Sequence, residues 1–218
     1  MPRNSMKVPY LRQDYTKSTL RREDLHEDPI VQFKLWFDQA LEMGIQDANA
    51  FTLSTLGLHG RPSSRIVLVK DIAKDGFAFY TNQESDKGKE IEDSAHVSML
   101  FFWKEMEKQV RIKGIARKID DETATKYFQS RPKGSQIGAW ASHQSQVIED
   151  RSILENRAEV LKKEYSDAQF LPKPPYWGGY IISPDSVEFW QGREDRLHDR
   201  FRYVLGGKNK WNITRLSP

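Results

Sequence analysis

The chain has 218 residues, no cysteine and a net charge of +3 from 34 basic and 31 acidic side chains. The lack of cysteine excludes disulfides, thiolate catalysis, zinc ribbons and iron–sulfur clusters, and the interleaved charge argues against a nucleic-acid binder. No window approaches the roughly 18 apolar residues of a membrane span, so we expect no membrane contact and a cytoplasmic protein.

The first 27 residues are polar and basic and predict a mobile N-terminal arm. Residues 28–218 contain no repeat and no separating linker, so they predict a single domain. Asp28-Pro29 is typical of a helix start, with a capping carboxylate before a proline at the first helical position. Apolar residues then recur at helical spacing as far as the stop predicted at Gly44: Ile30, Phe33, Phe37 and Leu41.

From residue 50 the apolar pattern changes to runs of β-branched and aromatic residues separated by turn signals. These runs predict strands over 50–56, 63–70, 76–82, 96–103, 108–119, 179–184, 186–192, 197–205 and 210–216. Helices are predicted over 85–94, 121–131 and 146–167, the first capped by Ser85 and the second ended by Pro132. The fold class is therefore mostly β with α additions, an antiparallel β-barrel with helices packed around it.

The stretch "EFWQGREDRLHDR" (188–200) begins like a strand and ends in a cluster of charge. On a strand, alternation places Arg196, His198 and Arg200 on one face. Three basic side chains directed the same way, just after an aromatic pair, predict a surface that faces an anion.

Several common motifs are missing. The sequence has no glycine-rich dinucleotide fingerprint after a strand, no Walker A loop and no Gly-x-Ser-x-Gly elbow. Its five histidines lack metal-ligand spacing, so no metal site is predicted. Basic and hydroxyl residues at element ends remain, and such residues form phosphate sites where no glycine loop does so.

Two such stretches lie in the first half of the chain. In "SSRIVLVK", Arg65 and Lys70 are five residues apart and would point to opposite faces of a strand, so they would bind different anions; surface charges at strand ends are the alternative. In "YTNQESDKGKE", Thr81, Ser85 and Lys87 lie at a strand-to-helix junction, where free N–H groups favour an anion. An ordinary capped surface helix is the alternative there.

Two more stretches follow. In "KYFQSRPKGSQ", Tyr127, Arg131 and Ser135 recur every four residues and could hold one phosphate, although a tyrosine packed on an arginine stem is the alternative. In "ASHQSQV", Gln144 and Ser145 offer an amide and a hydroxyl, or simply a polar loop.

Taken together, the chain resembles the pyridoxine/pyridoxamine 5′-phosphate oxidase family over nearly its whole length. The motifs that carry the resemblance are "SSRIVLVK", "FYTN", "KQVRIKG", "YFQSRPKGSQIGAW", "SHQS", "WGGY", "EFWQG", "RLHDR" and the terminal "RLSP". The resemblance implies an FMN-binding split β-barrel that works as a homodimer with active sites at the interface. It also implies oxidation of pyridoxamine 5′-phosphate or pyridoxine 5′-phosphate to pyridoxal 5′-phosphate, with O2 as acceptor and H2O2 as product.

The resemblance further implies roles for single residues. Arg65, Lys87, Thr81 and Ser145 are expected at the FMN phosphate. The rest of the FMN site is expected to comprise Ile66, Val67, Leu68, Lys70, Tyr80, Gln109, Gln144, Trp190 and Arg200. The substrate phosphate is expected to be held by Lys70, Tyr127, Arg131 and Ser135.

The catalytic residues implied are Arg196, over the reacting carbon, and His198, as a hydrogen-bond partner or proton acceptor. Both would also bind the substrate ring. Arg12 and Tyr15 would cover the bound substrate, so that the arm acts as a lid. Asp47 lies at the family position of an active-site aspartate.

One position departs from the family pattern. After "YTN" the family usually has Ser-Arg-Lys, whereas this chain reads Ser85-Asp86-Lys87. We expect Asp86 to turn toward solvent and toward Lys89, and we expect FMN to be retained less tightly.

Two other functions remain open. A flavin reductase or flavin-binding protein on the same barrel would need the FMN residues but not Tyr127, Arg131, Ser135, Arg196 and His198. A β-barrel nucleic-acid binder could use exposed aromatic and arginine side chains.

Overall fold

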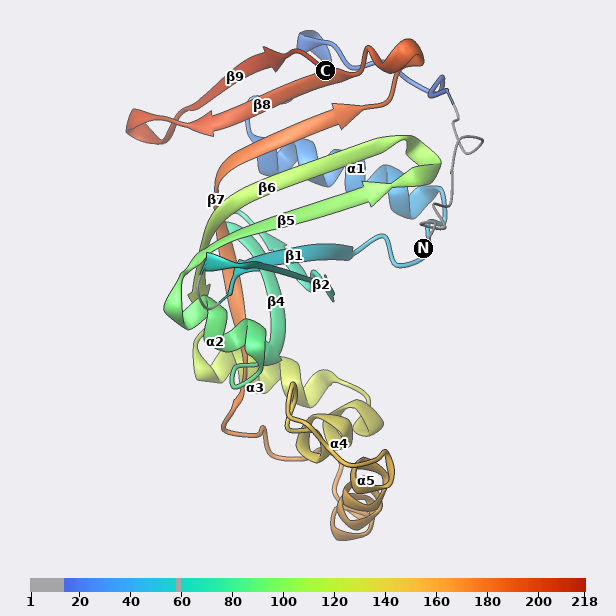
Figure 1. The fold of residues 1–218 in the computed structure, drawn as a ribbon, viewed down its shortest axis with the longest axis vertical. Helices are drawn as coiled ribbons and strands as arrows, with labels where there is room; N and C mark the ends of the chain where they lie inside the picture. The colour runs from blue at the N-terminus through green and yellow to red at the C-terminus, as the bar shows by residue number, and fades with distance from the viewer. Residues whose placement is uncertain (1–13, 58–59) are drawn as a thin grey trace, which may run out of the picture.

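The computed structural model describes residues 14–57 and 60–218, whose nine strands form one antiparallel sheet (Figure 1). The strands are β1 (Ala50–Leu56), β2 (Pro62–Leu68), β3 (Asp71–Ala73), β4 (Gly76–Asn82), β5 (His96–Trp103), β6 (Lys108–Lys118), β7 (Trp177–Gln191), β8 (Asp199–Leu205) and β9 (Trp211–Leu216). Their order is β2-β1-β5-β6-β7-β4-β3, and β8 and β9 continue the sheet from β7.

The long strand β7 gives the sheet its curvature. Its first part pairs with β4, its last part pairs with β8, and β6 pairs along almost all of it. The register with β6 shifts between Lys113 and Gly114, and such bulges bend a strand. At Gly114 a Cβ atom would lie 2.2 Å from the carbonyl oxygen of Ser183, so only glycine allows this close approach. The sheet therefore curls into a half-barrel.

The main core lies between the curled sheet and helix α1 (Pro29–Glu42). The Asp28 side chain accepts a hydrogen bond from the Ile30 N–H, and Gly44 follows the helix with a left-handed φ of +67°, as the sequence predicts. Phe33 is fully buried, with its ring 4.8 Å from that of Phe101 and 4.9 Å from that of Phe77. Burying each such ring contributes roughly 1.5–3 kcal/mol.

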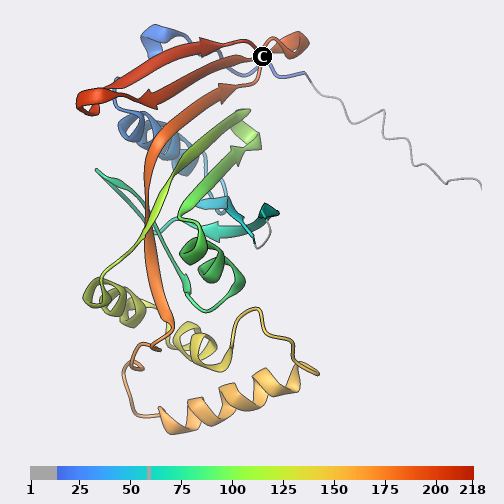
Figure 2. The ribbon, with the colours of Figure 1, turned by 60° about the vertical axis from the view of Figure 1, so that its left-hand side comes forward.

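The other helices lie at the opposite end of the sheet from β8 and β9 (Figures 1 and 2). They are α2 (Asp86–Asp93), α3 (Asp121–Ser130), α4 (Lys133–Ala141) and α5 (Ser152–Glu164). A second, smaller core joins α3, α4 and α5 to the start of β7 through Phe128, Ile137, Leu171 and Trp177, whereas α2 packs on the main core through Ile91. None of the helices in the described part of the chain is long and apolar enough to cross a membrane.

Several predicted boundaries need correction. Helix α4 and strand β3 were not predicted, and the strands predicted over 179–184 and 186–192 are one strand. Of the predicted mobile arm, residues 14–27 are described, and within them Leu20 and Leu25 are buried in the main core. These two leucines attach their segment to the sheet, because buried apolar surface opposes its release. The predicted boundary at residue 28 therefore does not separate them from the domain.

Candidate active site

A cleft of about 690 Å³ lies where β2 and β4 face α2, α4 and the loop after α4. It brings together ten of the residues predicted for the two phosphate sites and the flavin: Arg65, Ile66, Val67, Tyr80, Thr81, Lys87, Arg131, Ser135, Gln144 and Ser145. Residues that the sequence interpretation missed also line it: Asn82, Gly138, Ala139, Ser142 and Trp177. Gly138 and Ala139 belong to α4, so predicting α4 as a helix would have pointed to these two, whereas Asn82 and Trp177 lie in the motifs "FYTN" and "WGGY" already noted.

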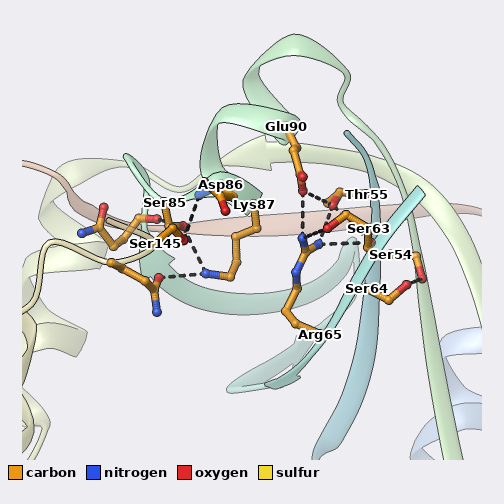
Figure 3. A network of polar contacts seen from close by, with 12 residues as sticks. Ser54, Thr55, Ser63, Ser64, Arg65, Ser85, Asp86, Lys87, Glu90 and Ser145 are labelled. Atoms are coloured by element: carbon orange, nitrogen blue, oxygen red, sulfur yellow. Dashed lines mark hydrogen bonds and ion pairs between the residues drawn. The ribbon is translucent and has the colours of Figure 1, made fainter. Parts of the chain in front are cut away.

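Lys87 lies at the α2 end of this cleft (Figure 3). Its Nζ donates hydrogen bonds to Gln144 Oε1 at 2.8 Å and to Ser85 Oγ at 3.1 Å. Burial, followed by the nearby charge of Arg65, lowers the pKa of Lys87 to about 8. The Asp86 N–H, at the start of α2, donates to Ser145 Oγ at 3.2 Å. An ammonium, a helix N-terminus and hydroxyls in one place form a suitable donor set for a phosphate.

Arg65 is already paired in the structure (Figure 3). Its guanidinium donates to Glu90 Oε2 at 2.8 Å and to Ser63 Oγ at 2.6 Å, and it also contacts Thr55 Oγ1. Burial disfavours the ionised form of Glu90, but hydrogen bonds from Thr55 and Arg65 outweigh it and keep the Glu90 pKa below its ordinary value. The sequence interpretation missed Glu90, because nothing in the residue pattern shows that α2 faces β2.

Arg131 also lines the cleft. Its guanidinium is 5.1 Å from the ring centre of Trp177, and its Nη1 is buried with no hydrogen-bond partner among the described residues. Burial lowers the pKa of Arg131 from its ordinary value. A buried donor without a partner is costly unless a ligand supplies the acceptor, so this atom fits an anionic group.

The Trp177 ring beside Arg131 is part of a stack of aromatic rings. Tyr127 stacks on Tyr80 with ring centres 4.0 Å apart, and Tyr80 stacks on Trp177 at 5.5 Å. Tyr127 therefore packs on aromatic rings and does not line the cleft, and because α3 ends at Ser130 with Arg131 extended, helical spacing does not give the two residues a shared face. Ser135 lines the cleft beside Arg131.

A second group of predicted residues gathers where β7 ends beside β8. Tyr15, Trp190 and His198 form an aromatic cluster, with Trp190 4.6 Å from His198 and Tyr15 5.6 Å from Trp190 between ring centres. Gln109 and Arg200 are the residues paired with Trp190 on the two neighbouring strands. In Figure 1 this end of β7 is far from α2 and α4, so one chain does not join the aromatic cluster to the cleft.

His198 has a defined hydrogen-bond pattern. Its Nδ1 accepts the backbone N–H of Arg193 at 3.1 Å, so the neutral ring carries its proton on Nε2. Burial, followed by the charges of Arg196 and Arg200, lowers the pKa of His198. Of the two roles predicted for His198, a neutral hydrogen-bond donor through Nε2 agrees with this geometry.

The strand predicted over 197–205 is confirmed as β8 (Asp199–Leu205), but the strand alternation predicted across Arg196, His198 and Arg200 is wrong. Strand β7 ends at Gln191 and β8 begins at Asp199. Between them Asp195 and Arg196 have φ values of 53° and 63°, and this left-handed pair turns the chain, so strand alternation does not hold across it. Arg196 is exposed in the turn, whereas the Arg200 guanidinium donates to Glu188 Oε1 at 3.0 Å.

Apart from Asp86, the remaining predicted residues lie outside the cleft or outside the described residues. Lys70 is exposed just after β2 and does not line the cleft, and Leu68 lies on the exposed face of β2. Asp47 is an exposed loop residue with a φ of 51°. Asp86 was predicted to turn toward solvent and toward Lys89; it is exposed but lines the cleft, and it forms no ion pair with Lys89 in the described part of the chain. Arg12 lies outside the described residues.

Comparison with known proteins identifies the family. Residues 37–164 match the family described as pyridoxamine 5′-phosphate oxidase, and residues 177–218 match the pyridoxine 5′-phosphate oxidase C-terminal dimerisation region. The chain is 46% identical over 213 residues to a pyridoxine/pyridoxamine 5′-phosphate oxidase of Salinibacter ruber, covering 97% of this chain and 99% of the relative. It is 49% identical over 208 residues to the protein of the same name from Paraburkholderia phymatum, covering 95% and 97%.

Comparison with solved structures supports the same family and the fold. PhzG from Burkholderia lata, in complex with tetrahydrophenazine-1-carboxylic acid, is 34% identical with a TM-score of 0.85, covering 90% of this chain and 95% of that one. An FMN-binding protein of Nostoc punctiforme related to pyridoxamine 5′-phosphate oxidase has a TM-score of 0.67 at 17% identity, covering 85% and 97%, and shows the fold alone. The split-barrel fold class predicted from the sequence is confirmed, and the chain belongs to the pyridoxamine 5′-phosphate oxidase family.

Proposed function

We propose that the protein oxidises pyridoxamine 5′-phosphate and pyridoxine 5′-phosphate to pyridoxal 5′-phosphate, using FMN and O2 and releasing H2O2. The names of relatives that are 46% and 49% identical support this activity. The observation that carries the proposal is the buried Arg131 Nη1, which has no partner among the described residues. A substrate phosphate would supply the acceptor that this donor lacks.

The donor set at the other end of the cleft fits the phosphate of FMN. Lys87, the N–H groups at the start of α2 and the hydroxyls of Thr81 and Ser145 would hold it. FMN, when bound, supplies the acceptor for the two electrons that leave the substrate. The protein's own task is then to bind, orient and polarise.

Substrate orientation would use both groups of residues. Arg131 and Ser135 would hold the substrate phosphate, which does not react. His198 would donate a hydrogen bond through Nε2 to the substrate's polar substituents, and Arg196 would polarise the oxygen or nitrogen on the reacting carbon. Fixing the phosphate and the ring together limits the substrate to a reactive geometry.

This arrangement needs two copies of the chain. The cleft lies beside α2 and α4 while the aromatic cluster lies at the far end of β7 (Figure 1). A homodimer in which one protomer's aromatic cluster faces its partner's cleft would complete two sites. The match of residues 177–218 to a dimerisation region supports it, as do apolar side chains left open on the sheet, such as Ile66 at 65% and Phe102 at 50% exposure.

Peroxide release on adding pyridoxamine 5′-phosphate to the FMN-loaded protein tests the activity. We expect peroxide from the phosphorylated substrate and little from unphosphorylated pyridoxamine. A split-barrel flavin reductase would instead oxidise a reduced nicotinamide with no pyridoxamine present. The ligand of PhzG has a carboxylate and no phosphate, so its oxidation would not need the phosphate contact of Arg131. If the wild type and Arg131→Ala both oxidised that compound at the same rate, the result would favour a PhzG-like activity.

Mixing two variants that are each strongly impaired tests the shared site, provided that activity is measured at a substrate concentration well below the KM of Arg131→Ala. In a hybrid dimer of Arg131→Ala and His198→Ala chains, one site carries both substitutions and the other carries neither. Unfolding the two variants together and refolding them should restore about a quarter of the wild-type activity, because half of the dimers are hybrids with one intact site. If both residues acted within one chain, no activity would return.

A further inference from the structure

Residues 15–20 form a strap that is fixed to the domain at two points. The backbone N–H of Lys17 donates to Glu107 Oε2 at 3.0 Å, and that of Leu20 donates to Asp199 Oδ2 at 3.1 Å. Both carboxylates are almost fully buried, with exposures of 7% for Glu107 and 9% for Asp199. Hydrogen bonds to buried ionised groups are among the stronger contacts in a protein.

Asp199 has three partners that come from three parts of the chain. Besides Leu20, its Oδ2 accepts from Arg193 Nη1 at 3.0 Å and its Oδ1 accepts from Arg215 Nη1 at 2.8 Å. Burial disfavours the charge on Asp199, but the hydrogen bonds from Arg215, Leu20 and Arg193 outweigh it and keep its pKa below the ordinary value. One carboxylate therefore joins the strap, the turn after β7 and strand β9.

Two of the segments that Asp199 joins, the strap and the turn after β7, also carry predicted site residues. The backbone N–H of Arg193 holds His198 through Nδ1. At the other end of the strap, the Tyr15 ring lies 5.9 Å from the His198 ring and packs on Gly192, where a Cβ atom would lie 2.6 Å from the Tyr15 ring. Strap and turn thus touch directly at Tyr15 and His198, and indirectly through Asp199.

We propose that Asp199 is a positioning residue for the substrate end of the site. Its carboxylate holds the strap and the 192–198 turn in one arrangement, and thereby places Tyr15 and His198 together over the substrate ring. The catalytic consequence rests on the proposed function, whereas the coupling of strap to turn can be measured without any activity.

The first experiment measures the coupling in full-length, FMN-loaded protein. Trypsin cleavage at Lys17, Arg21 and Arg22 is followed by mass spectrometry in the wild type and in Asp199→Asn. We expect these sites to be cut about tenfold faster in Asp199→Asn, because proteolysis follows the population of the open form. Glu159→Gln, which removes an exposed carboxylate paired with Lys162 on α5, is the matched control and should leave the rate unchanged.

The second experiment separates positioning from general loss of structure. In a double-mutant cycle with Tyr15→Ala, Asp199→Asn should lower kcat/KM for pyridoxamine 5′-phosphate about tenfold in the wild-type background and clearly less in the Tyr15→Ala background. Equal effects in the two backgrounds would overturn the proposal. Unchanged cleavage of the strap in Asp199→Asn would overturn it as well.

Two further outcomes are distinguishable. If Asp199→Asn does not fold, Arg193→Gln keeps the carboxylate and removes only its link to the turn; an unchanged kcat/KM in that variant would overturn the proposal. If the wild type releases no peroxide, the proposed function fails, and the cleavage rates still decide whether Asp199 couples the strap to the turn.

Discussion

The Arg65 guanidinium lies 2.8 Å from the Glu90 carboxylate, so one of the cations that line the cleft is already paired with an acid of the same chain. The side chain of Glu90 is only 12% exposed, so solvent screens this charge weakly. A phosphate dianion bound in the cleft would be attracted by the guanidinium and repelled by the carboxylate paired with it. Cofactor affinity should therefore depend on Glu90 as well as on the bases.

We expect Glu90→Gln to tighten FMN binding. The amide can still accept from Arg65, whose bonds to Ser63 and Thr55 remain, while the negative charge near the phosphate is lost. Titration of apo-protein by flavin fluorescence should show a Kd lower by about tenfold, or ~1.4 kcal/mol. Glu92→Gln, on the same helix but paired with Lys118 at the surface, is the control. Weaker binding in Glu90→Gln would mean that Glu90 acts by holding Arg65 in place.

FMN affinity should fall as the pH rises above about 8. Lys87, with a pKa of about 8 in the free protein, is charged below that pH and neutral above it. A bound phosphate favours the charged form, so the pKa rises on binding and binding takes up a proton above pH 8. The Kd should then weaken by up to about tenfold between pH 7 and pH 9. Lys87→Arg, which stays charged, should remove this loss, and a flat wild-type profile would show that Lys87 does not contact the phosphate.

Asp86→Arg should tighten FMN about tenfold at pH 7, or ~1.4 kcal/mol. Asp86 is exposed but lines the cleft at the start of α2, and its charge raises the Lys87 pKa. Replacing it with a base removes repulsion of the phosphate and also lowers the Lys87 pKa. The FMN affinity of Asp86→Arg should therefore begin to fall at a lower pH than the FMN affinity of the wild type. Equal or weaker affinity at pH 7 would place position 86 away from the phosphate.

Much of the fold could be predicted from the sequence because local rules decide it. Strand β1 alternates half-buried and buried residues as its pattern indicates, and Asp28-Pro29 starts α1. Helix α4 was missed because Pro132, Gly134 and Gly138 are typical of turns. The left-handed Asp195 and Arg196 were missed because nothing local demands that conformation.

The candidate site could be predicted only where a residue's role depends on its own chemistry. The basic and hydroxyl residues of the cleft were found in this way. Glu90 and Asp199 were not, because they act through partners 25 and 179 positions away, Arg65 and Leu20. Such contacts follow from how the strands and helices pack, which residue spacing does not show.

Arg131→Ala should raise KM for pyridoxamine 5′-phosphate far more than it lowers kcat. The guanidinium, whose Nη1 is buried without a partner among the described residues, would bind a phosphate that does not react, so its contribution should be the same in the ground state and the transition state. A charge-assisted hydrogen bond contributes about 1.5–3 kcal/mol, which corresponds to a rise in KM of roughly ten- to a hundredfold. Lys126→Ala, which removes an exposed cation from α3, the helix that ends just before Arg131, should change neither constant. A selective loss of kcat would refute the role of Arg131 in holding the phosphate.

Gly192→Ala should displace Tyr15 and lower kcat/KM. An alanine Cβ at this position would lie 2.6 Å from the Tyr15 ring, well inside van der Waals contact, and Gly192 is buried at the end of β7. Because real Cβ contacts are never this short, the Tyr15 ring is expected to shift from its place beside Trp190 and His198. We expect kcat/KM to fall about tenfold, and the overpacking should cost about 1–3 kcal/mol of unfolding free energy. Gly134→Ala is the matched control: no atom lies within 4 Å of its Cβ, and alanine is the better helix former by up to about 1 kcal/mol. If Gly192→Ala kept wild-type kcat/KM, Tyr15 would not cover the substrate during turnover.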